Sequence, residues 1–291
     1  MRIHALDGNR QWLDGGAMFG NAPRTVWQTW CPPDERHRIP LACRCMFAEL
    51  DDGRRVLFEA GIGAFFEPKL RDRYGVVEPH HVLLESLAHA GLAEDSIDAI
   101  VLSHLHFDHA GGLLSAYDDG PARLLFPKAR IYIGHTHWRR ALAPHPRDRA
   151  SFLPELNALL AKSDRVVLVG DDAVSDLAPF VRFHFSQGHT PGLMLSELDL
   201  TSGPLVFVAD LIPGLPWVHL PITMGYDRSP EVSIDEKTKL LEDLVARHGR
   251  LFFFHDPDVA CAEVTRDGKG RFAGAVVTSQ GEAGPQTPAK L

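Results

Sequence analysis

Four metal-capable side chains fall within six positions in the stretch Ser103-His104-Leu105-His106-Phe107-Asp108-His109-Ala110-Gly111-Gly112. The stretch follows an apolar segment, residues 97–102, that has the character of a short buried strand. His104 and His106 are two positions apart, so their side chains point the same way and can bind one metal ion together. Asp108 and His109 come where the chain turns towards the glycines, so they can face a second ion. Imidazole and carboxylate groups are the ligands that zinc takes in proteins, at ~2.0–2.2 Å.

Three later segments repeat this arrangement, in which an apolar strand ends and a metal-capable residue follows. A rigid strand that delivers a His or an Asp at its end is a common way to present site residues. Taken singly, each could be a helix cap or a loop contact. Together with the first stretch they supply five His and two Asp, enough for two ions if one Asp bridges. The residues are His189 after 181–185, Asp210 after 205–209 and His255 after 251–254.

The rest of the chain alternates strands and helices without a Pro- or Ser-rich linker. This pattern predicts one compact α/β domain, residues 1–291, made of two similar halves. Residues 1–40, rich in Gly, Pro and Trp, are expected to form an irregular N-terminal arm, and residues 281–291 a frayed tail. A β-hairpin is expected where two strands flank Asp51-Asp52-Gly53. Strands are predicted at 41–50, 54–60, 129–133, 165–169, 193–198 and 272–277, and helices at 82–92, 151–161 and 234–248.

Composition limits the partners. The formal net charge is -8 and the chain has no basic run, which argues against a nucleic-acid partner. The start of the chain lacks the features of a secretory signal, and no apolar run approaches the ~20 residues that span a membrane. Cys43 and Cys45 share one face of an expected strand and are poorly placed to bridge each other. We therefore expect a cytoplasmic protein with reduced thiols and no membrane partner.

The segment from His104 to His109 matches the HxHxDH signature of the metallo-β-lactamase superfamily, and His189, Asp210 and His255 match its later motifs in order. Within that superfamily the chain resembles the N-acyl homoserine lactonases and methyl parathion hydrolase, from about residue 41 to about residue 277. The resemblance implies an α/β fold, namely an αββα sandwich of two mixed β-sheets flanked by helices. It also places the site at one edge between the two sheets.

The resemblance further implies the role of each ligand. The two ions are expected to be Zn²⁺, although Co²⁺, Mn²⁺ or Fe²⁺ suits the same ligands. His135-Thr136-His137 lacks a partner motif, and we expect it to be structural or pocket-lining. One ion would be held by His104, His106 and His189, the other by Asp108, His109 and His255, and Asp210 would bridge them.

Two divalent ions ~3.5–4 Å apart can share a hydroxide and polarise a carbonyl oxygen, and zinc lowers the pKa of its water to ~7. We predict a quorum-quenching hydrolase that opens an N-acyl homoserine lactone by attack of the metal-bridging hydroxide. Asp108 is the candidate to carry the proton to the leaving oxygen. The sequence departs from many of the lactonases at Glu59, where they have Asp, and at Pro213, where they have a substrate-contacting Tyr. Tyr226 is the candidate substitute.

Other functions use the same scaffold. A phosphotriester or aryl-ester hydrolase would use the same dinuclear site and differ mainly in pocket shape. A glyoxalase-type thioester hydrolase would need a basic cluster for glutathione, and the flavin-linked diiron proteins usually have Glu at the position of His106. The full ligand set argues against a non-catalytic binding module. We expect a small ester or lactone as the substrate and a homodimer as the assembly.

Overall fold

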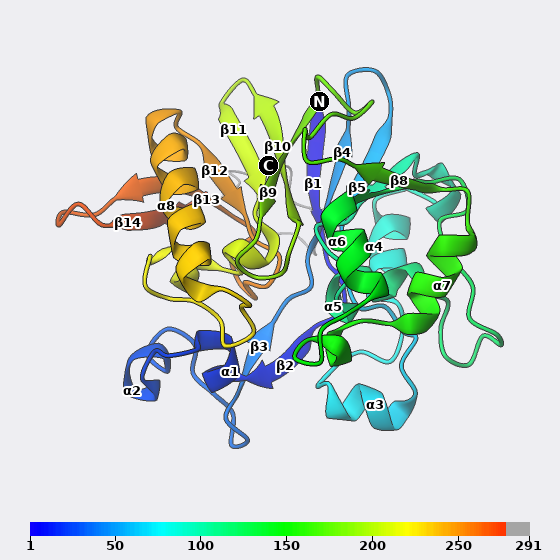
Figure 1. Cartoon of the computed structure of the whole chain (residues 1–291), viewed down its shortest axis with the longest axis horizontal. Helices are drawn as coiled ribbons and strands as arrows, with labels where there is room; N and C mark the ends of the chain where they lie inside the picture. The colour runs from blue at the N-terminus through cyan, green and yellow to red at the C-terminus, as the bar shows by residue number, and fades with distance from the viewer. Residues whose placement is uncertain (278–291) are drawn as a thin grey trace. The chain divides into compact units, whose positions relative to one another are not determined.

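The structure, a computed structural model, describes residues 1–277 (Figure 1). These residues divide into two compact units. Unit 1 consists of Met1–Arg10 and Cys43–Asp176, and unit 2 consists of Gln11–Ala42 and Leu177–Val277. The predicted frayed tail lies outside the described residues. The expectation of a single domain stays a prediction.

Unit 1 is built on a six-stranded mixed sheet with the order β1-β4-β5-β6-β7-β8. β4 pairs antiparallel with both β1 and β5, whereas β5, β6, β7 and β8 run parallel. The carboxyl ends of the parallel strands therefore meet at one edge of the sheet. The strands are β1 (Arg2–Leu6), β4 (Cys45–Glu49), β5 (Arg55–Phe58), β6 (Ala99–Val101), β7 (Arg130–Gly134) and β8 (Val166–Val169).

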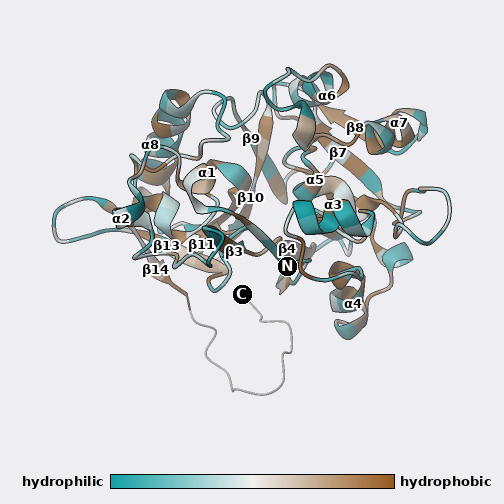
Figure 2. Cartoon of the chain, turned by 90° about the horizontal axis from the view of Figure 1, so that it is seen from below, coloured by the Kyte–Doolittle hydropathy of each residue, from teal (hydrophilic) through white to brown (hydrophobic). Residues whose placement is uncertain are grey.

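Helices of unit 1 cover its apolar strands. α4 contacts β1 and buries Leu83 and Leu87, while α6 contacts β7, β8 and α7. These side chains join a core in which Leu57, Ile100 and Ile131 are fully buried. α3 buries no residue and is mostly hydrophilic (Figure 2). The helices are α3 (Pro68–Arg73), α4 (Val82–His89), η1 (Glu94–Ser96), α5 (Phe107–Ala110), η2 (Gly111–Leu113), α6 (His135–Leu142), η3 (Arg149–Ser151) and α7 (Pro154–Lys162).

Unit 2 has its own six-stranded sheet, with the order β14-β13-β12-β11-β10-β9. β11 and β12 run parallel, and the other neighbours are antiparallel. Because β9 and β11 are both antiparallel to β10, the strands β9, β11 and β12 run in one direction. Helix α8 (Pro230–Ala246) packs against β13 (Figure 1). The strands are β9 (Val181–Ser186), β10 (Leu193–Leu200), β11 (Gly203–Phe207), β12 (Arg250–Phe252), β13 (Cys261–Arg266) and β14 (Phe272–Val276).

The expectation of an irregular arm over residues 1–40 is wrong. β1 is an edge strand of the unit 1 sheet, and residues 11–41 form an ordered part of unit 2. There the Phe19 ring stacks on Trp27, with centroids 5.5 Å apart, and on Trp217, with centroids 4.4 Å apart. Each element spans only four or five residues, too few for a periodic pattern to show in the sequence. The elements are β2 (Gln11–Asp14), α1 (Gly15–Phe19), α2 (Arg24–Trp27) and β3 (Arg38–Leu41), and β2 pairs with β3.

The predicted hairpin is confirmed, with Glu49 of β4 opposite Arg55 of β5. Its first strand does not begin at Leu41, which belongs to β3. The chain leaves the strand at the next residue, Ala42, because its amide donates to the carbonyl oxygen of His255. β13 was not predicted because charged residues interrupt its apolar ones. No helix within residues 1–277 is long and apolar enough to cross a membrane. The four cysteines are thiols in this part of the chain, as expected.

An ion-pair network joins β9, β10 and the end of α8. The carboxylate of Glu197 is buried and lies 2.7 Å from Nε2 of His184. It also pairs with the guanidinium groups of Arg182 and Arg247. Burial alone would raise the pKa of Glu197, but hydrogen bonds from His184 and Arg247 outweigh it and lower the pKa to about 2. The ionised carboxylate is therefore strongly favoured in the folded state.

We expect Glu197→Gln to lower the free energy of unfolding at pH 7 by about 1–3 kcal/mol, because the charged hydrogen bonds are lost. The folded-state pKa lies below the ordinary value of 4.5, so this stabilisation is present above pH 4.5 and is lost as the pH falls towards 2. Urea unfolding of both proteins across this range should show the difference shrinking, with exposed Glu242→Gln as a control. A difference that stays constant would contradict the assigned pairing.

Candidate metal centre

In unit 1 the candidate ligands and the polar side chains around them lie at the carboxyl ends of neighbouring parallel strands. Glu59 directly follows β5, His104 follows β6, and His137 lies in the first turn of the helix that follows β7. In open α/β sheets, ligands bind at this edge. The sequence separates these three side chains widely, and the sheet brings their strand ends together.

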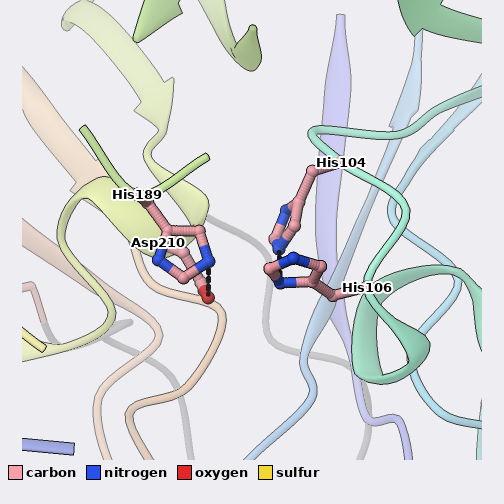
Figure 3. A group of neighbouring side chains, drawn as sticks. All are labelled: His104, His106, His189 and Asp210. Atoms are coloured by element: carbon pink, nitrogen blue, oxygen red, sulfur yellow. Dashed lines mark hydrogen bonds and ion pairs between the residues drawn. The ribbon is translucent and has the colours of Figure 1, made fainter. Parts of the chain in front are cut away.

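Three imidazole rings converge in the loop after β6. Nε2 of His104 lies 3.0 Å from Nδ1 of His106 (Figure 3), and the rings of His104 and His109 have centroids 3.9 Å apart. All three rings are buried. The Asp108 carboxylate is also buried, with Oδ2 4.0 Å from Nε2 of His109. The structure thus brings together the four predicted ligands of this loop.

Glu59 is a further carboxylate at this place. Its Oε1 accepts a hydrogen bond of 3.0 Å from the amide of Ser103 and lies 3.4 Å from Nδ1 of His109. Burial raises the pKa of Glu59, although His109 and Ser103 act against that rise. Glu59, His104 and His109 offer ligand atoms within 4.8 Å of one another. The Glu59 backbone has φ of +67°, a conformation that costs a non-glycine residue ~1–3 kcal/mol and is often found at functional sites.

His137 supports the loop rather than extending the ligand set. Its Nε2 accepts a hydrogen bond of 2.8 Å from the amide of Leu105, the residue between His104 and His106. An amide can only donate, so this Nε2 carries no proton and is already engaged. The contact agrees with the structural role expected for His137.

In unit 2 a single carboxylate lies between two imidazoles. Oδ2 of Asp210 is 3.1 Å from Nε2 of His189 (Figure 3), and its Oδ1 is 3.3 Å from Nε2 of His255. The three residues follow β9, β11 and β12, the strands that run in one direction. Asp210 lies in the short helix η4 (Ala209–Leu211), which begins with a residue of positive φ, Ala209. The three predicted ligands of this unit are therefore neighbours.

The hydrogen-bond partners of the outer nitrogens, which are the Nδ1 atoms, fix where the protons of these imidazoles lie. Nδ1 of His255 is 2.8 Å from the carbonyl oxygen of Ala42, which can only accept. Nδ1 of His189 is 2.9 Å from a carboxylate oxygen of Asp227, which also accepts. In the neutral rings each Nε2 then presents a lone pair to the Asp210 carboxylate. A cation between these acceptors makes both contacts favourable, so the donor set fits a divalent metal ion.

Sequence reasoning missed Asp227 as a functional residue. It lies 38 positions from His189, and no motif links the two. Its second oxygen accepts from the amide of Met224 at 3.1 Å, which holds the carboxylate in place. The backbones of the two segments are also joined, because the amide of Ser229 donates to the carbonyl of Gly188 at 2.8 Å. The candidate Tyr226 is the neighbour of Asp227 and is 44% exposed.

The aromatic residues divide between two environments. Phe107, within the metal loop, packs on Phe66 and Tyr74 of the same unit, with ring centroids 5.5 and 4.7 Å away. Phe66 and Tyr74 are only half-buried. Phe19 and Trp217, in contrast, are buried and stacked in unit 2, where they form core.

Comparisons with known proteins agree with this geometry. The family model described as the metallo-beta-lactamase superfamily matches residues 38–253. The chain is 25% identical over 233 residues to N-acyl homoserine lactonase AiiA of Bacillus thuringiensis subsp. kurstaki, covering 78% of this chain and 80% of that protein. It is 30% identical over 161 residues to N-acyl homoserine lactonase AiiB of Agrobacterium fabrum (strain C58 / ATCC 33970), covering 50% of this chain and 55% of the relative.

Solved structures show the same fold. A probable metal-dependent hydrolase from Staphylococcus aureus has a TM-score of 0.84 and 24% identity, covering 94% of this chain and 96% of that one. AidC, a dizinc quorum-quenching lactonase, has a TM-score of 0.72 and 21% identity, covering 95% and 94%. The predicted fold class, the metallo-β-lactamase sandwich of mixed sheets and helices, is confirmed.

We expect Gly188→Ala to weaken metal binding. A Cβ at Gly188 would lie 2.6 Å from the backbone nitrogen of Ser233, in the first turn of α8, so the loop that carries His189 must shift. We expect about tenfold weaker zinc binding in chelator competition and a loss of about 1–3 kcal/mol in urea unfolding. Gly268→Ala is the matched control, because a Cβ there meets no atom within 4 Å. Unchanged zinc affinity in Gly188→Ala would contradict this packing.

Proposed function

Because the chain belongs to the metallo-β-lactamase superfamily of hydrolases, we propose that it opens N-acyl homoserine-type lactones with a dinuclear metal centre. The observation that carries the proposal is the pair of Nε2 atoms, from His189 and His255, directed at the Asp210 carboxylate. Both rings have their other nitrogen engaged by an acceptor. This leaves the inner nitrogens ready to bind metal.

Seven side chains would hold two divalent ions, with zinc as the expected metal. The assignment follows the order of the motifs along the chain. When bound, such ions supply a water of lowered pKa and polarise the carbonyl oxygen of the substrate. His104, His106 and His189 would hold one ion, Asp108, His109 and His255 the other, and Asp210 would bridge them.

The protein's own groups would orient these ligands. The Asp227 carboxylate and the Ala42 carbonyl fix the proton positions of His189 and His255. His137 fixes the backbone between the first two histidines of the loop. Ligand orientation set in advance removes the reorganisation that binding or reaction would otherwise require.

Asp108 is the residue we propose for proton transfer. Its carboxylate is buried beside His109 in the short helix α5, which is part of the metal loop. Ring opening breaks the bond between the acyl carbon and the ring oxygen, and that oxygen must gain a proton. A carboxylate held beside the reacting atoms can accept a proton on attack and return it to the leaving oxygen.

The aromatic surface in unit 1 supports a substrate with an apolar chain. Phe66 and Tyr74 are half-buried and pack on Phe107, the residue between the ligands His106 and Asp108. Apolar surface next to a polar site is typical of a pocket that binds an amphiphilic ligand. The curated relatives AiiA and AiiB are N-acyl homoserine lactonases, which is the same substrate class.

The first test is ring opening of N-acyl homoserine lactones by zinc-loaded protein, followed as proton release. We expect turnover in the wild type and a loss of at least about 10³-fold in Asp210→Ala, because that variant removes the bridging carboxylate. Metal content is measured for both proteins. A wild type that holds two metal ions but opens no lactone would overturn the substrate assignment. Aryl esters and phosphotriesters, assayed with the same protein, would then identify the alternative.

We expect Tyr226→Phe to lower kcat/KM for the lactone about tenfold, ~1.4 kcal/mol, by removing a hydroxyl donor to the substrate oxygen. Pro213 stands where many of the lactonases have a substrate-contacting tyrosine, and it has no hydroxyl. Tyr226 has a hydroxyl and is exposed next to Asp227. Zinc affinity should stay unchanged. Tyr117→Phe, at a tyrosine that is 57% exposed, is the control. Equal kcat/KM in the two variants would rule out Tyr226 as the substitute.

A further inference from the structure

Helix α8 contains a lysine in an unusual place. Lys237 is only 1% exposed, although lysine is among the residue types that are almost never fully buried. Its ammonium group donates to the carbonyl oxygen of Ile222 at 2.7 Å and to that of Trp217 at 3.0 Å. The carbonyl oxygen of His219 lies 3.5 Å away. One side chain thus supplies donors to three carbonyls of one short segment.

That segment, residues 217–222, has little regular structure to hold it. It begins within η5 (Leu215–Val218), and neither Pro216, just before it, nor Pro221, within it, has an amide hydrogen to donate. Buried carbonyl groups need a donor, and an ammonium group offers three. Lys237 is therefore the group that fixes this backbone to α8.

The segment leads directly to the residues that orient His189. Met224 donates its amide to Asp227, and Asp227 in turn accepts from Nδ1 of His189. The amide of Gly225, between them, donates to the carbonyl of Ala17 at 2.8 Å. The position of the Asp227 carboxylate thus depends on how the chain before it is held.

We propose that Lys237 is a positioning residue that, through residues 217–222, holds the Asp227 carboxylate against Nδ1 of His189 and so sets the metal affinity of His189. The inference rests on the proposed role of His189 as a metal ligand. It assigns a function to Lys237, a buried cation that lies outside the metal-binding motifs of the sequence. Asp227 also attracts the ammonium group electrostatically, which opposes the effect of burial on the Lys237 pKa.

The test is a double-mutant cycle with Lys237→Met and Asp227→Asn. Methionine keeps the length of the side chain and removes its three donors. Zinc dissociation constants are measured by chelator competition, a readout that needs no substrate. We expect each single variant to bind the affected zinc about tenfold more weakly, because orienting partners of metal-bound histidines have effects of ~10–100-fold. We expect the double variant to match Asp227→Asn alone, since both changes act through one carboxylate.

Two results would overturn the proposal. One is a Lys237→Met protein with wild-type zinc affinity, and the other is a double variant in which the two losses multiply. Lys239→Met is the control, because this lysine lies on the same helix and is exposed. A wild type that binds no zinc would instead overturn the proposed function, so the two failures are distinguishable.

A second measurement covers the case in which Lys237→Met does not fold. In Lys237→Gln the shorter amide side chain keeps donors but cannot reach all three carbonyls. Nitrogen-15 histidine labelling reports the hydrogen-bonded Nδ1 proton of His189, identified by its loss in Asp227→Ala, which removes the accepting oxygen. We expect this proton to exchange with water at least about tenfold faster in Lys237→Gln. An unchanged exchange rate in a folded protein would overturn the proposal.

Discussion

The candidate site in unit 2 depends on the position of the Asp210 carboxylate, which lies between the inner nitrogens of His189 and His255. A buried carboxylate is unfavourable unless it is paired. Here the two imidazoles that it contacts present lone pairs, because the Ala42 carbonyl and the Asp227 carboxylate hold their protons on the far side. A positive charge between these acceptors would make both contacts favourable. The case for a metal ion in unit 2 thus rests on the hydrogen bonds that the two imidazoles make at their outer nitrogens.

Strand direction explains why the ligands meet. In unit 1 the candidate residues follow parallel strands, and in unit 2 they follow three strands that run one way. The antiparallel strands β4 and β10 deliver no ligand, since their carboxyl ends lie at the other edge. Glu59, which follows β5, and Ala209, which precedes Asp210, both have positive φ. Such strain persists only where the surrounding structure fixes the backbone, as it does at these two strand ends.

The candidate ligands could be picked out from the sequence because metal-capable residues follow apolar runs at four places along the chain. The positions of most strands were predictable because buried strands are apolar. Asp227 and Lys237 could not be predicted. A single carboxylate 38 residues from its partner leaves no pattern, and a lysine on a helix normally indicates a solvent-facing position. The N-terminal segment was mispredicted because stacked rings of Phe19, Trp27 and Trp217, far apart in sequence, stabilise elements too short to be periodic.

The path of the chain between the units has a consequence for its synthesis. The chain enters unit 2 at Gln11, returns to unit 1 at Cys43 and re-enters unit 2 at Leu177. A ribosome therefore completes the sheet of unit 1 while unit 2 consists only of residues 11–42, with β2, α1, α2 and β3. At typical elongation rates, this segment waits on the order of ten seconds for the rest of unit 2. Ala42, at its end, can bond to His255 only after β12 has been made. In the nascent chain, the two imidazoles around the Asp210 carboxylate are thus brought together late, after the four candidate ligands of the first loop have been made.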